Sequence, residues 1–249
     1  MELERSCDLL RSLHVPGDPL VLPNAWDVAS AKAVVAAGFP VVATTSGGVA
    51  ESLGYEDHEG APAAEMLAAA GRIARGVDVP VTVDAEAGYG LEPAELVAAL
   101  RDVGAAGCNL EDTDHGSESL LDPSDQADRL AAVRAAATAD GYGLVVNARI
   151  DVFLTGSGDV SEALERAAAY FAAGADCVYP IVLSEREAVS RFVSEAGGPV
   201  NILALPQAPP ASELAALGVA RISYGGLLHR ETIKQFTRTL DALRSSGMH

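Results

Sequence analysis

Short apolar, β-branched runs alternate with longer stretches of helical periodicity along the whole chain. Such runs are typical of buried strands, and the stretches between them are typical of amphipathic helices. We predict eight strands, at residues 20–23, 41–45, 79–84, 107–111, 143–148, 177–181, 200–204 and 221–224. The clearest helices are predicted at 62–75, 93–103, 124–139, 160–173, 184–195, 210–217 and 230–244.

Glycine marks the change from helix to strand at four places, in the phrases Ala-Ala-Gly-Phe-Pro, Val-Gly-Ala-Ala-Gly, Ala-Ala-Gly-Ala-Asp and Ala-Leu-Gly-Val-Ala. Each glycine can end a helix in the left-handed conformation before the next strand. Eight strand–helix units in 249 residues match a (β/α)8 barrel better than an open doubly wound sheet. Residues 45–50 also lack the glycine spacing of a dinucleotide-binding turn. We therefore predict an α/β protein with one TIM barrel domain over residues 1–249.

The composition excludes several classes of partner. A formal net charge of −18 would repel nucleic acid and anionic membranes. No apolar run reaches the ~18 residues of a spanning helix, and the N-terminus is acidic, so we expect no membrane partner and a cytoplasmic location. Cys7, Cys108 and Cys177 are widely spaced, which predicts buried, reduced thiols rather than disulfides or a zinc site.

Polar residues follow the predicted strands at the end where barrel enzymes carry their active sites. They are Asn24, Asp27, Ser46, Gly47, Asp84, Glu86, Glu111, Asp112, Asn147, Arg149 and Asp151. Carboxylates gathered at the mouth of an apolar barrel are costly unless cations compensate them. We predict Mg²⁺ as that cation, with Mn²⁺ as a possible substitute, because these positions offer only oxygen ligands. The alternative is that Glu86 and Asp112 merely cap the helices that follow.

Two further features of these strand ends suggest an anion site. The Gly-rich segment 46–48 could present backbone amides to a carboxylate or phosphoryl group, or it could be an ordinary flexible loop. Arg149 could clamp an anion through two hydrogen bonds, or it could form a structural salt bridge with Asp151 or Glu111.

Several of these segments together resemble the isocitrate lyase and phosphoenolpyruvate mutase superfamily. The resemblance covers nearly the whole chain and rests on residues 22–27, 45–50, 52–57, 83–90, 107–112 and 147–151, which include Val83-Asp84-Ala85-Glu86 and Leu110-Glu111-Asp112. It implies Mg²⁺ and a small 2-oxo or 2-hydroxy acid, with carbon–carbon or phosphorus–carbon chemistry through a pyruvate-like enolate. The metal would stabilise the enolate oxygen.

The resemblance also implies roles for individual residues. Asp84 would bind the metal directly, Glu86 and Glu111 would hold it through water, and Asp57 would lie near it as a catalytic residue. The family usually has aspartate at the position of Glu86. Arg149 would clamp the substrate, and the remaining candidate substrate-binding residues are Ser46, Gly47, Gly48 and Asn201.

The chain departs from the best-known members in the segment after Asp112. Isocitrate and methylisocitrate lyases carry Lys-Lys/Arg-Cys-Gly-His there, but residues 113–120 contain no cysteine. They also place hydroxyl residues after the asparagine that corresponds to Asn201, and this chain does not, so we predict neither of those two activities. The lysine and asparagine of a phosphoenolpyruvate mutase loop are absent too. His115 could serve as the proton donor or be an exposed loop residue; the other candidates are His58, His229, Tyr55 and Tyr89.

The leading expectation is a Mg²⁺-dependent, oxaloacetate decarboxylase-like lyase of a small 2-oxo or 2-hydroxy dicarboxylic acid. The alternatives are a phosphonopyruvate hydrolase or phosphonomutase-type enzyme, and an inactive barrel that binds a metabolite. The resemblance further implies a homo-oligomer, a tetramer or dimer, in which the C-terminal helix at 231–244 could be exchanged between subunits.

Overall fold

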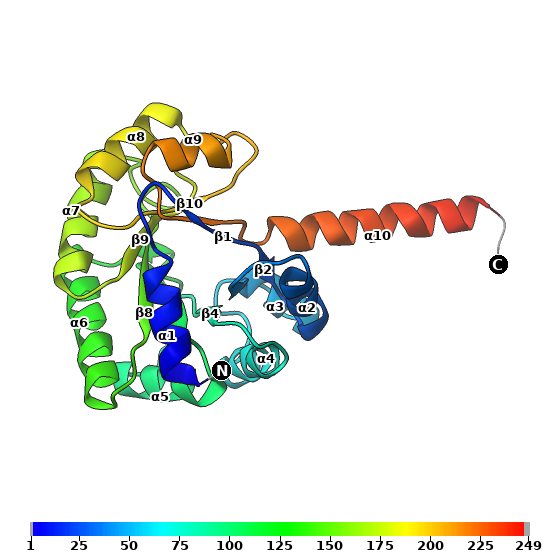
Figure 1. Cartoon of the computed structure of the whole chain (residues 1–249), viewed down its shortest axis with the longest axis horizontal. Coiled ribbons are helices and arrows are strands. Elements are labelled where there is room, and N and C mark those ends of the chain that lie inside the picture. Colours follow the sequence, from blue (N-terminus) through cyan, green and yellow to red (C-terminus); the bar gives the residue numbers. More distant parts are fainter. Residues whose placement is uncertain (1, 247–249) are drawn as a thin grey trace.

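The computed structural model describes residues 2–246, and its parallel strands form a barrel surrounded by helices (Figure 1). One run of strands follows the order β2 (Asn24–Ala25), β3 (Val42–Thr44), β4 (Val81–Asp84), β5 (Gly107–Glu111), β8 (Val145–Ile150) and β9 (Cys177–Pro180). A second run follows the order β1 (Leu20–Leu22), β11 (Arg221–Ser223) and β10 (Asn201–Leu203). The predicted TIM barrel is confirmed.

Two local features close the barrel. The predicted strand 20–23 ends one residue earlier, as β1, and Pro23 separates it from β2, so that β1 pairs with β11 and β2 pairs with β3. Proline has no N–H to give to a ladder, which explains why the hydrogen-bonding partner changes at this residue. On the other side, Val178 of β9 forms a parallel bridge to Val200, and its N–H donates to the Pro199 carbonyl at 3.0 Å.

The helices of the outer layer agree with the sequence pattern from α4 onwards. They are α4 (Ala63–Arg75), α5 (Pro93–Val103), α6 (Pro123–Ala139), α7 (Val160–Ala172), α8 (Arg186–Glu195), α9 (Ala211–Ala216) and α10 (Leu227–Ser245). The sequence analysis did not predict α1 (Leu3–Ser12), α2 (Val28–Ala36) or α3 (Ser46–Leu53). α2 begins at a capping box in which the Asp27 carboxylate accepts from the Ser30 N–H at 2.7 Å.

Helix α1 buries Cys7 and Leu10 and is also held by polar contacts with distant residues. Arg11 donates to the Asp176 carboxylate at 2.8 Å and to the main-chain oxygens of Gly143 and Leu144 at 3.0 and 3.2 Å. These partners lie just before strands β9 and β8, so α1 covers the N-terminal end of the barrel. The barrel interior is built mainly from valine, alanine and leucine, and Cys7, Cys108 and Cys177 are free and buried as predicted.

Two segments differ from their expected form. The Gly-rich residues 46–48 are the first turn of α3 and not a loop. The segment after Asp112 contains a small antiparallel hairpin of β6 (Thr113–Asp114) and β7 (Ser119–Leu120). Asp112 anchors this hairpin, because its main-chain oxygen accepts from the Leu121 N–H at 2.8 Å.

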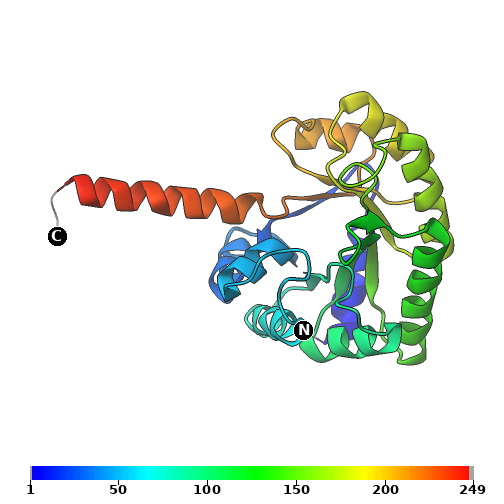
Figure 2. The same ribbon diagram turned by 180° about the vertical axis from the view of Figure 1, so that it is seen from behind.

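Helix α10 leaves the barrel and projects away from it (Figures 1 and 2). Four of its apolar side chains are exposed: Ile233 at 44%, Phe236 at 59%, Leu240 at 48% and Leu243 at 46%. Within residues 2–246, no helix is both long and apolar enough to cross a membrane.

Candidate active site

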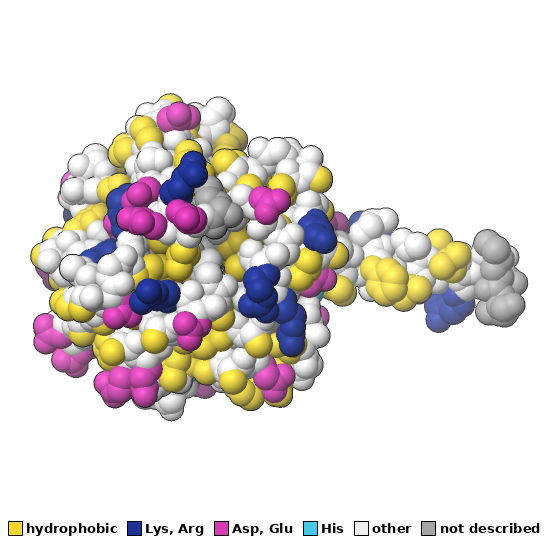
Figure 3. Space-filling view, turned by 60° about the horizontal axis from the view of Figure 1, so that its bottom comes forward, with side chains coloured by type: hydrophobic (Ala, Val, Ile, Leu, Met, Phe, Trp, Pro, Cys, Tyr) yellow, Lys and Arg dark blue, Asp and Glu magenta, His cyan; other side chains and the backbone are white. Residues whose placement is uncertain are grey.

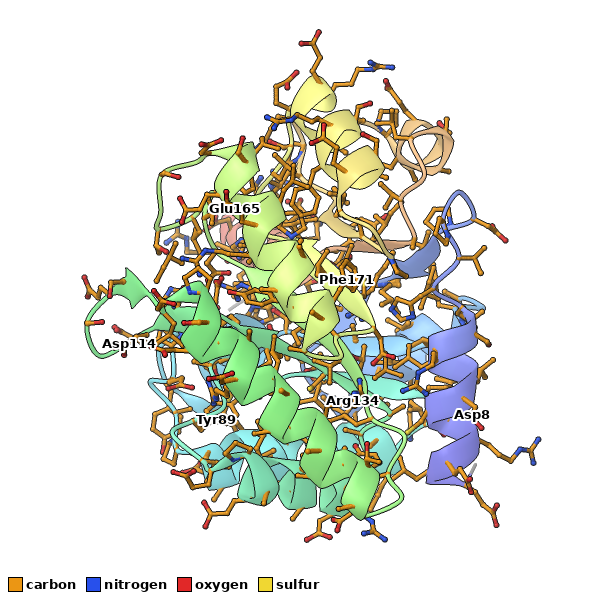
Figure 4. All side chains as sticks on the ribbon, turned by 90° about the vertical axis from the view of Figure 1, so that its left-hand side faces the viewer. Asp8, Tyr89, Asp114, Arg134, Glu165 and Phe171 are labelled. Carbon is orange, nitrogen blue, oxygen red and sulfur yellow. The ribbon has the colours of Figure 1, made fainter. Side chains whose placement is uncertain are left out.

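A cavity of about 260 Å³ opens at the C-terminal ends of the barrel strands, and we call it the candidate cavity. Figure 4 shows the hairpin with Asp114 on one side of the barrel and α1 with Asp8 on the opposite side. The residues that line the cavity come from most of the strand ends: Asn24, Thr45, Ser46, Asp57, His58, Asp84, Glu86, Asn109, Glu111, Arg149, Leu154, Tyr179, Ile181, Leu203, Ser223, Gly225, Gly226 and Arg230.

Four predicted acids, Asp57, Asp84, Glu86 and Glu111, line this one cavity. Asp84 ends β4, and its carboxylate accepts from the Ser46 N–H at 3.0 Å and from the Asn109 side-chain amide at 3.3 Å. Its own N–H donates to the Thr44 hydroxyl at 2.8 Å. Neighbouring strands therefore hold Asp84 from both sides, and the barrel brings the two carboxylate segments together.

Glu86 lies in a tight turn after β4, with a left-handed φ of 49°. Its carboxylate accepts from the Glu59 N–H at 2.6 Å, and the Glu59 carboxylate in turn accepts from the Tyr89 N–H at 2.5 Å. His58, Glu59 and Tyr89 also have positive φ, at 65°, 58° and 59°. Such conformations cost about 1–3 kcal/mol for residues other than glycine and concentrate at functional sites.

The pKa of Glu86 is raised to about 7, chiefly by burial and also by the nearby Asp84, Asp57 and Glu111 carboxylates, while the hydrogen bond from the Glu59 N–H opposes the rise. Among the residues of 2–246, Glu86 forms no salt bridge. Negative charge at this end of the cavity is thus incompletely compensated by the protein itself.

Arg149 lies on β8, lines the cavity and pairs with two buried acids. It forms an ion pair with Glu111, and its Nε and Nη2 donate to the two oxygens of Asp151 at 2.7 Å each. Burial acts to lower the pKa of Arg149, but the Glu111 and Asp151 carboxylates raise it above its usual value. The structural salt bridges expected as one alternative are present, and Arg149 also lines the cavity, where the role of an anion clamp stays a prediction.

Asp112, although adjacent to Glu111, takes no part in the cavity lining. Its carboxylate accepts from the Tyr170 hydroxyl at 2.6 Å, from Arg166 at 3.1 Å and from the Asp151 N–H at 2.8 Å. The Thr113 hydroxyl donates to Asp151 at 2.7 Å. This buried network fixes Asp151, and through it the guanidinium of Arg149.

His115 lies on the hairpin, with its Nε2 2.5 Å from the Glu111 carboxylate. That hydrogen bond raises the pKa of His115. His115 lines a second cavity of about 580 Å³, whose wall shares Asp57, His58 and Arg149 with the candidate cavity. The rings of His58 and His115 lie 5.3 Å apart.

The other candidate proton donors lie less favourably. The Tyr55 hydroxyl donates to Glu65 at 2.8 Å, and the Tyr89 hydroxyl donates to the Asp84 main-chain oxygen at 3.4 Å. His229 is buried against Trp26 and lies 3.4 Å from Glu51. None of these three residues lines the candidate cavity or the second one, whereas His58 lines both and His115 lines the second, so these two imidazoles are better placed.

The predicted substrate-binding residues are only partly brought together. Ser46 lines the candidate cavity, whereas Gly47 and Gly48 line a neighbouring one of about 350 Å³. The glycine at 47 leaves room for the Asp57 carboxylate, since a Cβ there would lie 2.6 Å from it. Asn201 does not line the cavity; it is buried beneath it and donates to the Ser223 hydroxyl at 3.2 Å.

The sequence analysis did not single out several polar residues of the cavity: Thr45, Asn109, Tyr179, Ser223 and Arg230. Asn109 lies two residues before Glu111 on β5, and the period of two in a strand places both side chains on the same face. Arg230 follows Gly225 and Gly226 at the start of α10. Its guanidinium lies close to Gly226, because a Cβ added at Gly226 would come within 2.6 Å of it. Within residues 2–246, Arg230 forms no salt bridge.

The donors around the cavity fit a hydrated divalent cation. Within the described part of the chain, no three His, Cys, Asp or Glu side chains converge closely enough to hold a metal ion as a group. The carboxylates instead stand around a cavity that leaves room between them, and their oxygens are hard ligands. Mg²⁺ usually keeps several waters and needs only one or two protein carboxylates.

The comparison with known proteins decides the family. The family model described as phosphoenolpyruvate phosphomutase matches residues 10–244. The chain belongs to this family. One relative is an uncharacterized protein of Mycobacterium tuberculosis H37Rv. It is 36% identical to this chain over 216 residues, which cover 86% of this chain and 81% of the relative.

Two further relatives of this chain are named as lyases. The 2-methylisocitrate lyase of Salmonella typhimurium LT2 is 28% identical over 261 residues, covering 95% of this chain and 87% of that protein. The crystal structure of 2,3-dimethylmalate lyase, a member of the PEP mutase/isocitrate lyase superfamily, is 26% identical with a TM-score of 0.87, and covers 98% of this chain and 85% of that one. The superfamily therefore contains both lyases and mutases.

Proposed function

We propose that the protein is a Mg²⁺-dependent lyase that cleaves a carbon–carbon bond of a small 2-oxo or 2-hydroxy dicarboxylic acid. The observation that carries this proposal is the placement of four acids and two arginines around one cavity of about 260 Å³. Asp84 would bind the ion directly, and Glu86 and Glu111 would hold its waters. When bound, the ion would supply positive charge to stabilise an enolate oxygen.

The residues of the chain can bind and orient such a substrate. Arg149, held by Asp151 and Glu111, presents a fixed guanidinium to a substrate carboxylate. Arg230 is the free cation of the cavity within residues 2–246 and would bind the distal carboxylate. His115, whose pKa is raised by Glu111, would carry a proton at the boundary of the two cavities. The name of 2,3-dimethylmalate lyase denotes a hydroxy dicarboxylic acid, which supports this substrate class.

The decisive experiment combines binding and turnover. We expect Mg²⁺ with oxalate, an enolate mimic, to raise the melting temperature. We also expect the enzyme to cleave one acid from a panel of 2-oxo and 2-hydroxy dicarboxylic acids, and we expect a chelator to stop this cleavage. Pyruvate or another 2-oxo product would be measured by coupled reduction. If neither Mg²⁺ nor oxalate shifts the melting temperature and no acid is consumed, the lyase proposal is wrong.

The second candidate is cleavage or rearrangement of a phosphonate such as phosphonopyruvate. The match to the phosphoenolpyruvate phosphomutase model favours it. The arginines of the cavity can hold a phosphonate as well as a carboxylate. Release of inorganic phosphate from phosphonopyruvate, without cleavage of any dicarboxylic acid, would select this candidate over the lyase.

Glu86 makes metal binding pH-dependent. Its pKa of about 7 in the metal-free protein means that the carboxyl is largely protonated below that pH and must lose its proton to hold the ion or its waters. We expect Mg²⁺ affinity to fall as the pH drops from 8 to 6, with proton release on binding, as measured by calorimetry in buffers of different ionisation enthalpy. The control is Glu86→Gln, which should bind more weakly and lose this pH dependence; an equal slope in wild type and variant would contradict the assignment.

Arg230 is expected to set the preference for dianionic ligands. We expect Arg230→Met to weaken binding of a dicarboxylate by about tenfold or more, since a hydrogen bond to a charged group contributes about 1.5–3 kcal/mol. Binding of a monocarboxylate of similar size should change much less. Arg238→Met, on the same helix but paired with Glu231 at 3.8 Å, is the control. Equal losses for both ligand classes would show that Arg230 does not contact the distal group.

We further propose that a second copy of this chain covers the apolar face of α10. Ile233, Phe236, Leu240 and Leu243 follow a three–four spacing, which is the seam of a helix–helix contact. The helix projects beyond the barrel, and apolar side chains are visible along it in Figure 3. Its charges are mixed, with Glu231 near Lys234 and Asp241 near Arg244, so an identical helix can face it without net repulsion.

This oligomer is testable by sedimentation. Phe236→Glu together with Leu240→Glu should convert a dimer or tetramer to monomer, because charges would be buried at the seam. Thr237→Glu together with Arg238→Glu is the matched control and should leave the mass unchanged. A monomeric wild-type protein at micromolar concentration would contradict the proposal.

A further inference from the structure

The barrel core beneath the candidate cavity contains a buried cation. Arg221 begins β11 and is 1% exposed, yet within residues 2–246 it forms no salt bridge. Its Nη2 donates to the Asn109 side-chain oxygen at 3.1 Å, while its Nε and Nη1 have no hydrogen-bond partner among these residues. An unpaired buried charge is costly, so stability does not explain an arginine at this position.

The single hydrogen bond of Arg221 leads to the candidate metal ligand. Asn109 receives Arg221 on its side-chain oxygen and donates from its side-chain nitrogen to the Asp84 carboxylate at 3.3 Å. Asp84 and Asn109 are register partners on β4 and β5. Asn147, the register partner of Asn109 on β8, also donates to the Asn109 oxygen, at 2.8 Å.

Both ends of this chain of hydrogen bonds fix its direction, because the Asp84 carboxylate only accepts and the Arg221 guanidinium only donates. An amide can turn over and exchange its donor for its acceptor, and the Asn147 oxygen has no partner within residues 2–246 that would prevent this. A guanidinium has only donors. The Asn109 oxygen must therefore face Arg221, and its NH₂ must face Asp84.

We propose that Arg221 is a positioning residue: through Asn109 it orients the Asp84 carboxylate so that the remaining lone pairs of that carboxylate point into the candidate cavity. Asn109 occupies one carboxylate oxygen and the Ser46 N–H occupies the other. The rotation of the carboxylate is thus fixed before any cation arrives. This inference rests on the proposed function of Asp84 as a metal ligand.

The test compares Arg221→Met with Arg221→Lys. The methionine keeps an unbranched apolar stem and removes the charge and the donors, so we expect the dissociation constant of Mg²⁺, measured by calorimetry without substrate, to rise about tenfold, within the 10- to 100-fold range typical of outer-shell partners. Lysine keeps a donor and should stay within about threefold of wild type. Asn109→Leu should act like Arg221→Met, and the double variant should be no worse than either single one.

Two controls separate this role from a structural one. Arg134→Met removes a partly buried arginine that donates to Asp176 and to two main-chain oxygens at the other end of the barrel, and it should lower the melting temperature while Mg²⁺ affinity is unchanged. If Arg221→Met behaves in the same way, or if its effect and that of Asn109→Leu add, the proposal is overturned. If the methionine variant does not fold, Asn109→Leu and Arg221→Lys carry the test.

Failure of the proposed function is distinguishable from failure of this inference. If wild-type protein binds no Mg²⁺, the metal proposal fails. The side-chain amide resonances of Asn109 in metal-free protein then still report on Arg221: we expect a single sharp pair in wild type and in Arg221→Lys, and exchange broadening in Arg221→Met. Identical sharp spectra in all three proteins would overturn the positioning role.

Discussion

Arg149→Met is expected to destabilise the protein by about 3–5 kcal/mol at pH 8, because it leaves buried acids without their cation. Glu111 is 1% exposed and Asp151 is fully buried, and Arg149 is the arginine that pairs with both. Equilibrium unfolding in urea measures the loss. The effect should be smaller at pH 5.5, since burial raises the pKa of Glu111 and the uncompensated carboxyl can then take up a proton.

The sign of this pH dependence follows from linkage. Without Arg149, the folded-state pKa of Glu111 lies above its unfolded value, so the folded state binds more protons and loses stability as the pH rises. The double variant Arg149→Met/Glu111→Gln should recover part of the loss. Arg191→Met, which removes an exposed pair with Glu195 at 3.3 Å, is the control and should cost less than about 1 kcal/mol. An Arg149→Met loss as small as that of the control would contradict the buried ion-pair account.

Asp84→Asn is expected to weaken Mg²⁺ binding by at least about 100-fold and to abolish turnover, since it removes the carboxylate that is proposed to bind the ion directly. The fold should persist, because an asparagine oxygen can still accept from the Ser46 N–H. The variant should also bring the pKa of Glu86 down, since Asp84 is one of the charges that raise it. Calorimetry measures the first effect, and the pH dependence of residual metal binding measures the second.

Asp8→Asn is the matched control for Asp84→Asn. Asp8 lies on α1, at the opposite end of the barrel from the hairpin (Figure 4). We expect no change in Mg²⁺ affinity there, so that any loss in Asp84→Asn is due to its position and not to the change in net charge. Retention of wild-type affinity by Asp84→Asn would show that the ion, if bound, is held elsewhere.

The local sequence was sufficient to predict the bounds of a helix or strand where its packing agrees with its hydrophobic periodicity. The strand at 107–111 is predicted and observed with the same bounds, and the helix at 93–103 likewise, because a proline at its start and Gly104 at its end mark both limits. The carboxylates of the candidate cavity were also predictable, since residues at the ends of parallel strands meet at the same end of a barrel.

The segments that were wrong or missed depend on contacts distant in sequence. Glycines disfavour a helix at 46–48, but these residues form the first turn of α3, where the glycine at 47 leaves room for the Asp57 carboxylate. Helix α1 is held by Arg11 and its partners more than 130 residues away. Asn201 was expected to bind substrate, and its strand register places it beneath the cavity instead.

The sequence by itself determined the barrel, the acidic cavity and the identity of Asp84, Glu86, Glu111 and Arg149, because strand period and strand order suffice to bring these residues to one end. Only the tertiary structure decided how each is held. Burial and hydrogen-bond geometry depend on side chains from non-adjacent strands, so these contacts appear only once the chain is folded. They are the ion pairs of Arg149 with two acids, the buried ion pair of Asp112 with Arg166, and the hydrogen bond from Arg221 to Asn109.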